Sequence, residues 1–269
     1  MNRPCPAKTR KDKCGAPLYD AIRDLGVTLI LWAYFTVGFA LFFAPFYLFC
    51  FCFCTQRQAA FQKLNCRFYR GFFWLLRLLI PRLKWHIEAK VRAIRGAVIV
   101  CNHISYLDSI LLISLYERHT TIVKNRLFKI PIFKTMLRLS GYLPAAGGGQ
   151  GFSDLMITQM DNLKACLAAG GNLIVFPEGT RRRNGVSGDI HPGAFKIARL
   201  TKAPLNVVTI ENSERLFTPG KFRFNSGYDD AIILKFKAEF QVGNPRDHLL
   251  SAILRVRSIF TNVPHGSAL

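Results

Sequence analysis

Two short segments of the sequence carry side chains that could act together in a reaction. The first, Asn102-His103-Ile104-Ser105-Tyr106-Leu107-Asp108, places an imidazole five positions before a carboxylate. A neutral histidine can take a proton from an alcohol when a carboxylate holds its other ring nitrogen. A turn into a helix over this distance can bring the two side chains together. The segment therefore suggests a general base; an exposed histidine followed by a helix-capping aspartate is the alternative.

The second segment, Phe176-Pro177-Glu178-Gly179-Thr180-Arg181, is suited to binding an anion. Gly179 permits a tight turn and lets backbone N–H groups approach a ligand. Arg181 presents a planar guanidinium that matches a phosphate, and Glu178 could orient Arg181 or hold the acceptor molecule. The two arginines that follow are more typical of a solvated surface. A base and an anion receptor together suit a reaction at the hydroxyl of a negatively charged substrate.

Both segments follow short apolar runs that predict buried strands. The predicted strands are His86–Val91, Ala97–Cys101, Thr120–Lys124, Asn172–Phe176, Leu205–Ile210 and Ala231–Phe240. The predicted helices are Ser109–Arg118, Pro131–Leu139, Ser153–Ala169, Pro192–Leu200 and Pro245–Phe260. This alternation predicts an α/β fold with a mostly parallel sheet flanked by helices. Ligands bind at the carboxyl ends of such strands, so we expect the two segments to share one cleft.

An N-terminal hydrophobic segment precedes this domain. From Leu25 to Gln56 there is no charged residue and no histidine, whereas about 20 residues suffice to cross a bilayer. Pro45 interrupts the run, and basic residues flank it on both sides. Two interpretations stay open: a single span with an interfacial continuation, or a re-entrant hairpin. Residues 62–80 place four basic residues on one stripe, which suggests an amphipathic helix at an anionic membrane surface, with an ordinary core helix as the alternative.

These patterns divide the chain into three parts. We expect a basic tail over residues 1–24, membrane-anchoring helices over 25–84 and a catalytic domain over 85–269. The net charge of +21 and a 50% hydrophobic content favour an anionic membrane as partner. A nucleic-acid binder is disfavoured, because no recognisable module pairs the arginines with exposed aromatics.

The cysteines and histidines indicate a reducing compartment and no metal. Cys50, Cys52 and Cys54 alternate within the apolar run, and no Cys-x-x-Cys pair or zinc-like cluster occurs. Buried free thiols are the expected state. We therefore expect the protein at the cell inner membrane, with its catalytic domain facing the cytoplasm.

Together the two segments resemble motifs of the glycerophospholipid acyltransferase family, whose best-known member is 1-acylglycerol-3-phosphate acyltransferase. The family's Asn-His-x-Ser-x-x-Asp block matches Asn102, His103, Ser105 and Asp108, and its Phe-Pro-Glu-Gly-Thr-Arg block matches residues 176–181 without a change. Residues 124–141 also look like the family's intermediate block. The resemblance covers about residues 85 to 215.

The resemblance implies an O-acyltransferase that moves a fatty acyl group onto a lysolipid. His103 and Asp108 would be catalytic, and Glu178, Gly179, Thr180, Arg181 and Lys124 would bind substrate. Acyl-CoA or acyl carrier protein would be the co-substrate, with no further cofactor. The implied acceptor is 1-acyl-sn-glycerol-3-phosphate, which would give phosphatidic acid.

One departure from the family's pattern keeps the acceptor open. After Gly141 the family usually reaches an arginine that contacts the acceptor phosphate, but residues 145–150 of this chain contain no basic residue. A less anionic acceptor, such as lyso-ornithine lipid, is therefore an alternative. A lipid-binding membrane protein without catalysis is another.

Overall fold

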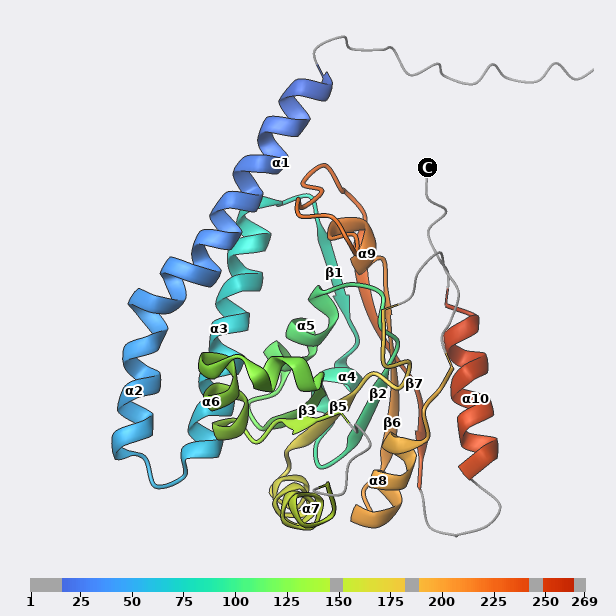
Figure 1. Ribbon diagram of the computed structural model, residues 1–269. Coiled ribbons are helices and arrows are strands. Elements are labelled where there is room, and N and C mark those ends of the chain that lie inside the picture. Colours follow the sequence, from blue (N-terminus) through green and yellow to red (C-terminus); the bar gives the residue numbers. More distant parts are fainter. Residues whose placement is uncertain (1–15, 146–151, 182–188, 242–248, 264–269) are drawn as a thin grey trace, which may run out of the picture.

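The computed structural model describes residues 16–145, 152–181, 189–241 and 249–263. A central sheet lies between two layers of helices, and a long N-terminal helix packs outside one of these layers (Figure 1). The strands are β1 (Lys84–Ile87), β2 (Val98–Cys101), β3 (His119–Val123), β4 (Leu143–Pro144), β5 (Asn172–Val175), β6 (Leu205–Glu211) and β7 (Ala231–Phe240). The N-terminal helices are α1 (Ala16–Ala33), the π-helical η1 (Tyr34–Phe43), α2 (Ala44–Phe53) and α3 (Arg57–Leu79). The remaining helices are α4 (Ala89–Ala93), α5 (Leu107–Leu115), the 3₁₀ helix η2 (Asn125–Lys129), α6 (Pro131–Leu139), α7 (Phe152–Ala168), α8 (Gly193–Thr201), α9 (Ser213–Leu216) and α10 (Leu249–Thr261).

The sheet is mostly parallel, as the sequence predicts. Its strand order is β1-β7-β6-β2-β5-β3-β4. The pairs β2–β5, β2–β6, β3–β5 and β3–β4 are parallel, whereas β7 runs antiparallel to β6 and parallel to β1. The carboxyl ends of β2, β3, β5 and β6 therefore lie at one edge of the sheet.

Two apolar cores cover the two faces of this sheet. Along β2, Val98 and Val100 pack with α7, α8 and α10, whereas Ile99 and Cys101 pack with α3 and α5. All four side chains are fully buried. Burial on both faces explains why the strands read as continuous apolar runs rather than as alternating patterns.

The strand predicted at residues 86–91 is wrong in its second half, where the chain forms a helix. Pairing of β1 with β7 ends at Ile87, and the Glu88 carboxylate then accepts the N–H of Phe236 at 2.8 Å. The chain turns into α4 instead, which buries Val91 completely. The short elements β4 and α9 lack a strong sequence pattern, and we did not predict them. The predicted helix start at Pro245 falls outside the described residues.

The N-terminal hydrophobic segment forms one uninterrupted helix from α1 through η1 to α2 (Figure 1). Pro45 lies in the first turn of α2, where the helix continues past it, and the N–H of Ala44 bonds five residues back to Phe39. The re-entrant hairpin is therefore wrong. Leu18–Phe53, 36 residues long, is by length and composition the one described helix able to cross a membrane, and only 17% of its most apolar window is buried.

Helix α3 buries its apolar side within the protein, as the core-helix alternative predicts. Nine of its residues are buried, including Phe68 and Phe72, and they face the N-terminal helix and α5. The Tyr34 ring stacks on Phe68 with centroids 5.1 Å apart, and its hydroxyl donates to the Phe68 carbonyl at 2.7 Å. A side chain at Gly71 would collide with that hydroxyl. The basic stripe of α3 is the side that remains exposed.

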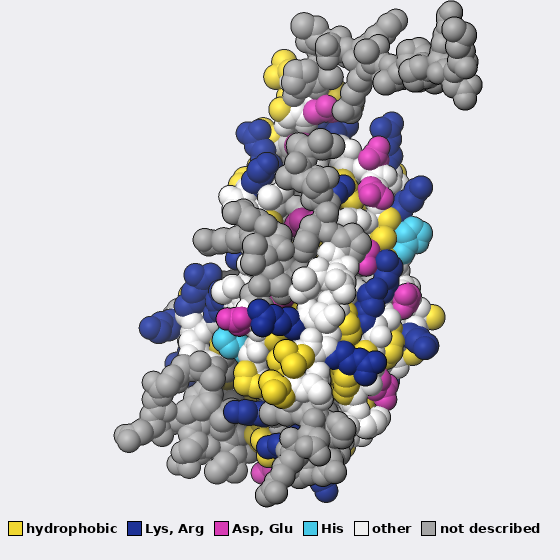
Figure 2. Space-filling model, turned by 90° about the vertical axis from the view of Figure 1, so that its right-hand side faces the viewer, with side chains coloured by type: hydrophobic (Ala, Val, Ile, Leu, Met, Phe, Trp, Pro, Cys, Tyr) yellow, Lys and Arg dark blue, Asp and Glu magenta, His cyan; other side chains and the backbone are white. Residues whose placement is uncertain are grey.

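On the face opposite the long N-terminal helix, the positive charge of the described residues is scattered (Figure 2). Lys and Arg side chains lie there among acidic ones. Charge on the visible part of this face does not gather into one stripe of the kind that would track a nucleic-acid backbone.

A buried polar chain joins the N-terminal helix to the sheet. The Tyr47 hydroxyl donates to Asn65 Oδ1 at 2.5 Å, and Asn65 Nδ2 donates to the Tyr142 hydroxyl at 3.1 Å. Tyr142 in turn lies 2.7 Å from Nε2 of His119, whose Nδ1 lies 2.9 Å from the Tyr116 carbonyl. These distances fit a neutral His119 that donates through Nδ1 and accepts at Nε2. Burial lowers the pKa of His119 to about 4.

Acidification is expected to destabilise the fold through His119. Between pH 6.5 and 4 the unfolded chain binds a proton at this histidine whereas the native state does not, so the stability present above pH 6.5 is lost as the pH falls. A pKa of about 4 in place of 6.5 corresponds to about 3 kcal/mol. Thermal unfolding midpoints of wild type and His119→Gln from pH 7 to 4.5 measure this. The variant should be less stable at pH 7 but decline less steeply; parallel curves would contradict the assignment.

Candidate active site

Three neighbouring parallel strands bring the candidate residues to one edge of the sheet. His103 follows β2, the turn at residues 176–181 follows β5, and Ser213 follows β6. Because β2 lies between β5 and β6, its carboxyl end is flanked on both sides. The order of strands thus explains how residues distant in sequence meet.

Asn102 fixes the point at which the chain leaves β2. Its Nδ2 donates to the Ile210 carbonyl at 2.8 Å, and its Oδ1 accepts the Ile210 N–H at 2.8 Å. The side-chain amide thereby extends the pairing of β2 with β6 by one step. Asn102 is fully buried, so both bonds are shielded from water. This clamp sets the position of the next residue, His103.

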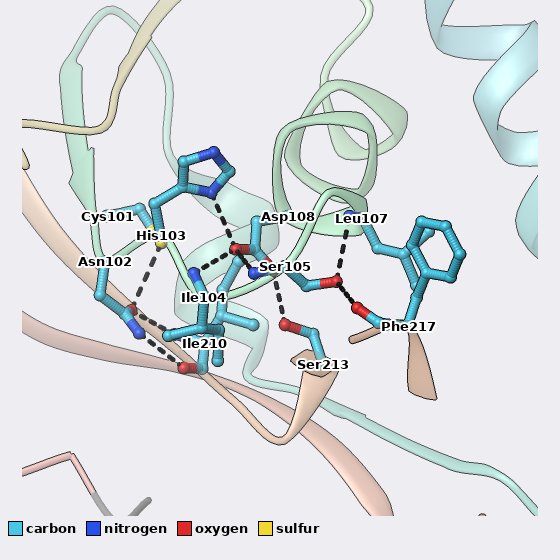
Figure 3. A network of polar contacts seen from close by, with 10 residues as sticks. All are labelled: Cys101, Asn102, His103, Ile104, Ser105, Leu107, Asp108, Ile210, Ser213 and Phe217. Atoms are coloured by element: carbon cyan, nitrogen blue, oxygen red, sulfur yellow. Dashed lines mark hydrogen bonds and ion pairs between the residues drawn. The ribbon is translucent and has the colours of Figure 1, made fainter. Parts of the chain in front are cut away.

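His103 and Asp108 form a hydrogen-bonded pair, as their spacing suggests (Figure 3). His103 Nδ1 lies 3.0 Å from Asp108 Oδ2. The same oxygen accepts the N–H groups of Ile104 and Ser105, each at 2.7 Å. Asp108 is fully buried in the first turn of α5, whereas 14% of the His103 side chain is exposed. In Figure 3 the second ring nitrogen, Nε2, points away from Asp108 and from the network.

Ser213 completes the surroundings of the carboxylate, and the sequence did not point to it. Its hydroxyl donates to Asp108 Oδ1 at 2.5 Å. The backbone reaches this position through Asn212, which has a φ of 70°. With four donors around it, the carboxylate is held in one orientation. The signal that could have identified Ser213 is its place directly after β6, at the same sheet edge as His103.

The turn after β5 lies against the histidine. The ring of Phe176 packs on that of His103 with centroids 4.3 Å apart. Gly179 has a φ of 64°, which favours glycine, and its N–H donates to the Phe176 carbonyl at 3.0 Å. The turn therefore keeps an apolar side chain against the imidazole while its tip extends outward.

Arg181 contacts the first segment through Tyr106. Its guanidinium carbon lies 3.5 Å from the centroid of the Tyr106 ring. The two segments are thus in contact at two points, Phe176 with His103 and Arg181 with Tyr106. The sequence pattern of the first segment suggested no role for Tyr106.

The other predicted binding residues occupy different environments. Glu178 is buried at 4% exposure, Thr180 is exposed, and Lys124 is exposed directly after β3. Arg182, Arg183 and residues 146–150 of the glycine-rich loop lie outside the described residues. Within the described ranges, no group of three or more His, Cys, Asp or Glu is arranged to hold a metal ion.

An apolar cavity of about 460 Å³ lies beside this site. Its wall includes Tyr106 and Leu107 at the start of α5, Phe217 after α9, and Trp32 and Phe35 of the N-terminal helix. The site therefore combines a proton acceptor, a cation and an apolar chamber. This combination can accommodate an amphipathic molecule with a hydroxyl next to an anionic group.

The comparisons with known proteins agree with this description. Residues 82–211 match the family model described as Acyltransferase. The chain is 32% identical over 126 residues to 1-acyl-sn-glycerol-3-phosphate acyltransferase BAT2, chloroplastic, of Brassica napus, covering 46% of this chain and 35% of that protein. It is 26% identical over 172 residues to the putative 1-acyl-sn-glycerol-3-phosphate acyltransferase acl-2 of Caenorhabditis elegans, covering 60% and 56%. The chain thus spans 35% to 56% of the length of these relatives.

The fold also has a solved counterpart. The crystal structure of the 1-acyl-sn-glycerophosphate (LPA) acyltransferase PlsC from Thermotoga maritima superposes with a TM-score of 0.69, at 23% identity, over 90% of this chain and 95% of that one. At this identity the similarity concerns the fold.

Proposed function

We propose that the chain is an acyltransferase that transfers a fatty acyl group from acyl-CoA or acyl carrier protein to the free hydroxyl of a lysolipid, and the match of residues 82–211 to the Acyltransferase family model supports this. The proposed acceptor is 1-acyl-sn-glycerol-3-phosphate, which would give phosphatidic acid. The observation that carries the proposal is the His103–Asp108 pair, which lies in the same segment as Tyr106, the residue that Arg181 stacks on.

The reaction follows from the orientation of the imidazole. Nε2 of His103 accepts the hydroxyl proton of the acceptor, and the resulting alkoxide oxygen bonds to the thioester carbonyl carbon. The carbon–sulfur bond then breaks, and the imidazolium returns its proton to the departing thiolate. Asp108 holds the Nδ1–H tautomer and stabilises the transient positive charge of the ring. The acyl group moves directly to the acceptor, without an acyl-enzyme.

The second segment supplies recognition in this proposal. Arg181 binds the phosphate of the acceptor, with Gly179, Thr180 and Lys124 available at the same sheet edge. Glu178 is buried, which suits orientation of the turn better than direct contact with the lipid. The apolar cavity can take an acyl chain, because burying methylene groups there removes them from water.

We further propose that the long helix lies on one leaflet rather than crossing the bilayer. Arg67 is exposed on α3, which packs along this helix (Figure 1), and Phe222 stacks on Trp32 with ring centroids 5.5 Å apart, between the exposed Lys221 and Arg223. A crossing helix would draw these cations toward hydrocarbon, at about 2.5–3.5 kcal/mol for each one near the bilayer centre. An in-plane helix leaves them at the headgroups of the inner membrane, on its cytoplasmic side.

Acidic substitutions on the exposed side of this helix should release the protein from membranes. Phe46 and Phe49 are 59% and 58% exposed. We expect the double change Phe46→Glu and Phe49→Glu to lower the vesicle-bound fraction severalfold in flotation with anionic vesicles. The matched control carries Leu250→Glu and Leu254→Glu on α10, exposed on the opposite side of the molecule. Equal loss in both variants would contradict a membrane-specific role.

The activity itself is tested with purified protein and a labelled acyl donor. The acceptor panel contains lysophosphatidic acid and lyso-ornithine lipid, and products are identified by mass. Transfer to lysophosphatidic acid supports the proposal. Transfer to lyso-ornithine lipid alone would agree with the missing basic residue in segment 145–150 and replace the acceptor. Lysolipid binding without transfer from either donor would indicate a non-catalytic protein.

A further inference from the structure

Tyr106 occupies the boundary between the charged and the apolar parts of the site. On one side the Arg181 guanidinium carbon lies 3.5 Å from its ring centroid. The same residue lines the apolar cavity of about 460 Å³. Tyr106 lies between His103 and Asp108 in sequence, immediately before α5 begins at Leu107.

The contact with Arg181 has a clear physical consequence. A cation over the face of an aromatic ring is attracted by the ring quadrupole. At 3.5 Å from the centroid the guanidinium is in van der Waals contact with the ring, so the freedom of its long side chain is reduced. Stacking uses the face of the guanidinium and leaves N–H groups at its edge free for a bidentate contact with an anion.

Two phenylalanine side chains support the Tyr106 ring. Tyr106 packs on Phe217 with centroids 5.7 Å apart, and Phe217 stacks on Phe224 at 4.4 Å. The Phe217 carbonyl accepts the Ser105 hydroxyl at 2.8 Å, which ties this support to the turn that carries His103. Tyr106 is nevertheless 43% exposed, so the ring is held in place but remains accessible from the site.

We propose that Tyr106 is a positioning residue that fixes Arg181 for the anionic headgroup of the acceptor and thereby determines affinity for that headgroup. The proposal rests on the proposed function, in which Arg181 binds the acceptor phosphate. The Arg181 guanidinium contacts the face of the aromatic ring, so the phenol oxygen of Tyr106 is not needed for this role. Tyr106 holds the cation on one side and bounds the apolar cavity on the other, where the headgroup and the chain of a lipid diverge.

The test is a double-mutant cycle on the full chain, with lysophosphatidic acid as acceptor. Tyr106→Leu should raise the acceptor KM about five- to thirtyfold, with kcat and the donor KM within about twofold. Tyr106→Phe, which keeps the aromatic face, should stay within about threefold of wild type. In an Arg181→Ala background, Tyr106→Leu should have no further effect on the acceptor KM.

The controls separate positioning from general damage. Phe240→Leu removes the ring near Arg255, a cation–ring contact of the same kind but longer, at 5.8 Å and far from the site, and should leave the acceptor KM unchanged. If Tyr106→Leu lowers the melting temperature markedly, Tyr106→Met replaces it in the cycle. Additive effects of the Tyr106 and Arg181 changes, or a loss confined to kcat, would overturn the proposal while leaving the function intact. Absence of transfer by the wild type to any lysolipid would overturn both.

Discussion

Replacing His103 by alanine is expected to lower kcat about 10³- to 10⁴-fold, because it removes the imidazole that takes the proton from the acceptor hydroxyl in the proposed reaction. The free Nε2 atom is the acceptor of that proton, and the Asp108 contact at 3.0 Å prepares the ring for it. The measurement is the steady-state rate of labelled phosphatidic acid formation at saturating acceptor and donor. Acceptor KM should change little, since the imidazole acts mainly in the transition state.

The control is a histidine away from the site. His86 is exposed on β1, at the far edge of the sheet, and His86→Ala should behave like wild type. Both variants should keep a cooperative thermal transition and vesicle binding, because His103 donates only one side-chain hydrogen bond in the described network. Turnover of His103→Ala within tenfold of wild type would remove His103 from the role of base.

The second large effect is expected for Asp108→Asn, with a loss of about 10²- to 10⁴-fold in kcat. The amide is isosteric, and its oxygen can still accept the N–H groups of Ile104 and Ser105 at the Oδ2 position. The negative charge that stabilises the imidazolium is lost, however, so the free energy of the transition state rises. The folded structure should survive, which a thermal melt verifies.

Ser213→Ala provides the matched comparison. It removes the hydroxyl bonded to Asp108 Oδ1 but leaves the charge and the His103 contact in place. We expect a loss of no more than about tenfold, because one hydrogen bond to a charged group contributes about 1.5–3 kcal/mol, only part of which affects the transition state. Equal losses in Ser213→Ala and Asp108→Asn would show that orientation, not charge, is the contribution of Asp108.

The sequence was sufficient for the type of most elements in the α/β domain. Apolar runs such as those at β2 and β5 are buried on both faces, so local composition already identifies them. The sequence did not predict the correct element where tertiary contacts determine the secondary structure. After Ile87 the chain continues to an apolar Val91, which reads equally well as strand or helix; the end of pairing with β7 and the Glu88 contact to Phe236 select the helix.

For the helices before the α/β domain, too, the sequence predicted the type of element but not its packing partner. An uncharged run identifies a helix that exposes apolar side chains, but the sequence does not reveal which partner covers the apolar side of α3. In the structure that partner is the protein itself, through Phe68, Phe72 and the buried Asn65. An amphipathic pattern is the same for a membrane surface and for a protein core, so periodicity alone could not separate them.

By itself the sequence determined the chemical groups of the candidate site: His103 and Asp108 within one turn of chain, and Arg181 after a second strand. Local spacing was enough because five residues across a turn can close a contact between two side chains. Only the tertiary structure decided what surrounds them. Ser213 and Tyr106 obtain their contacts from the strand order, which sets β6 and β5 on either side of β2. Such contacts join residues far apart in the chain, and no local pattern encodes them.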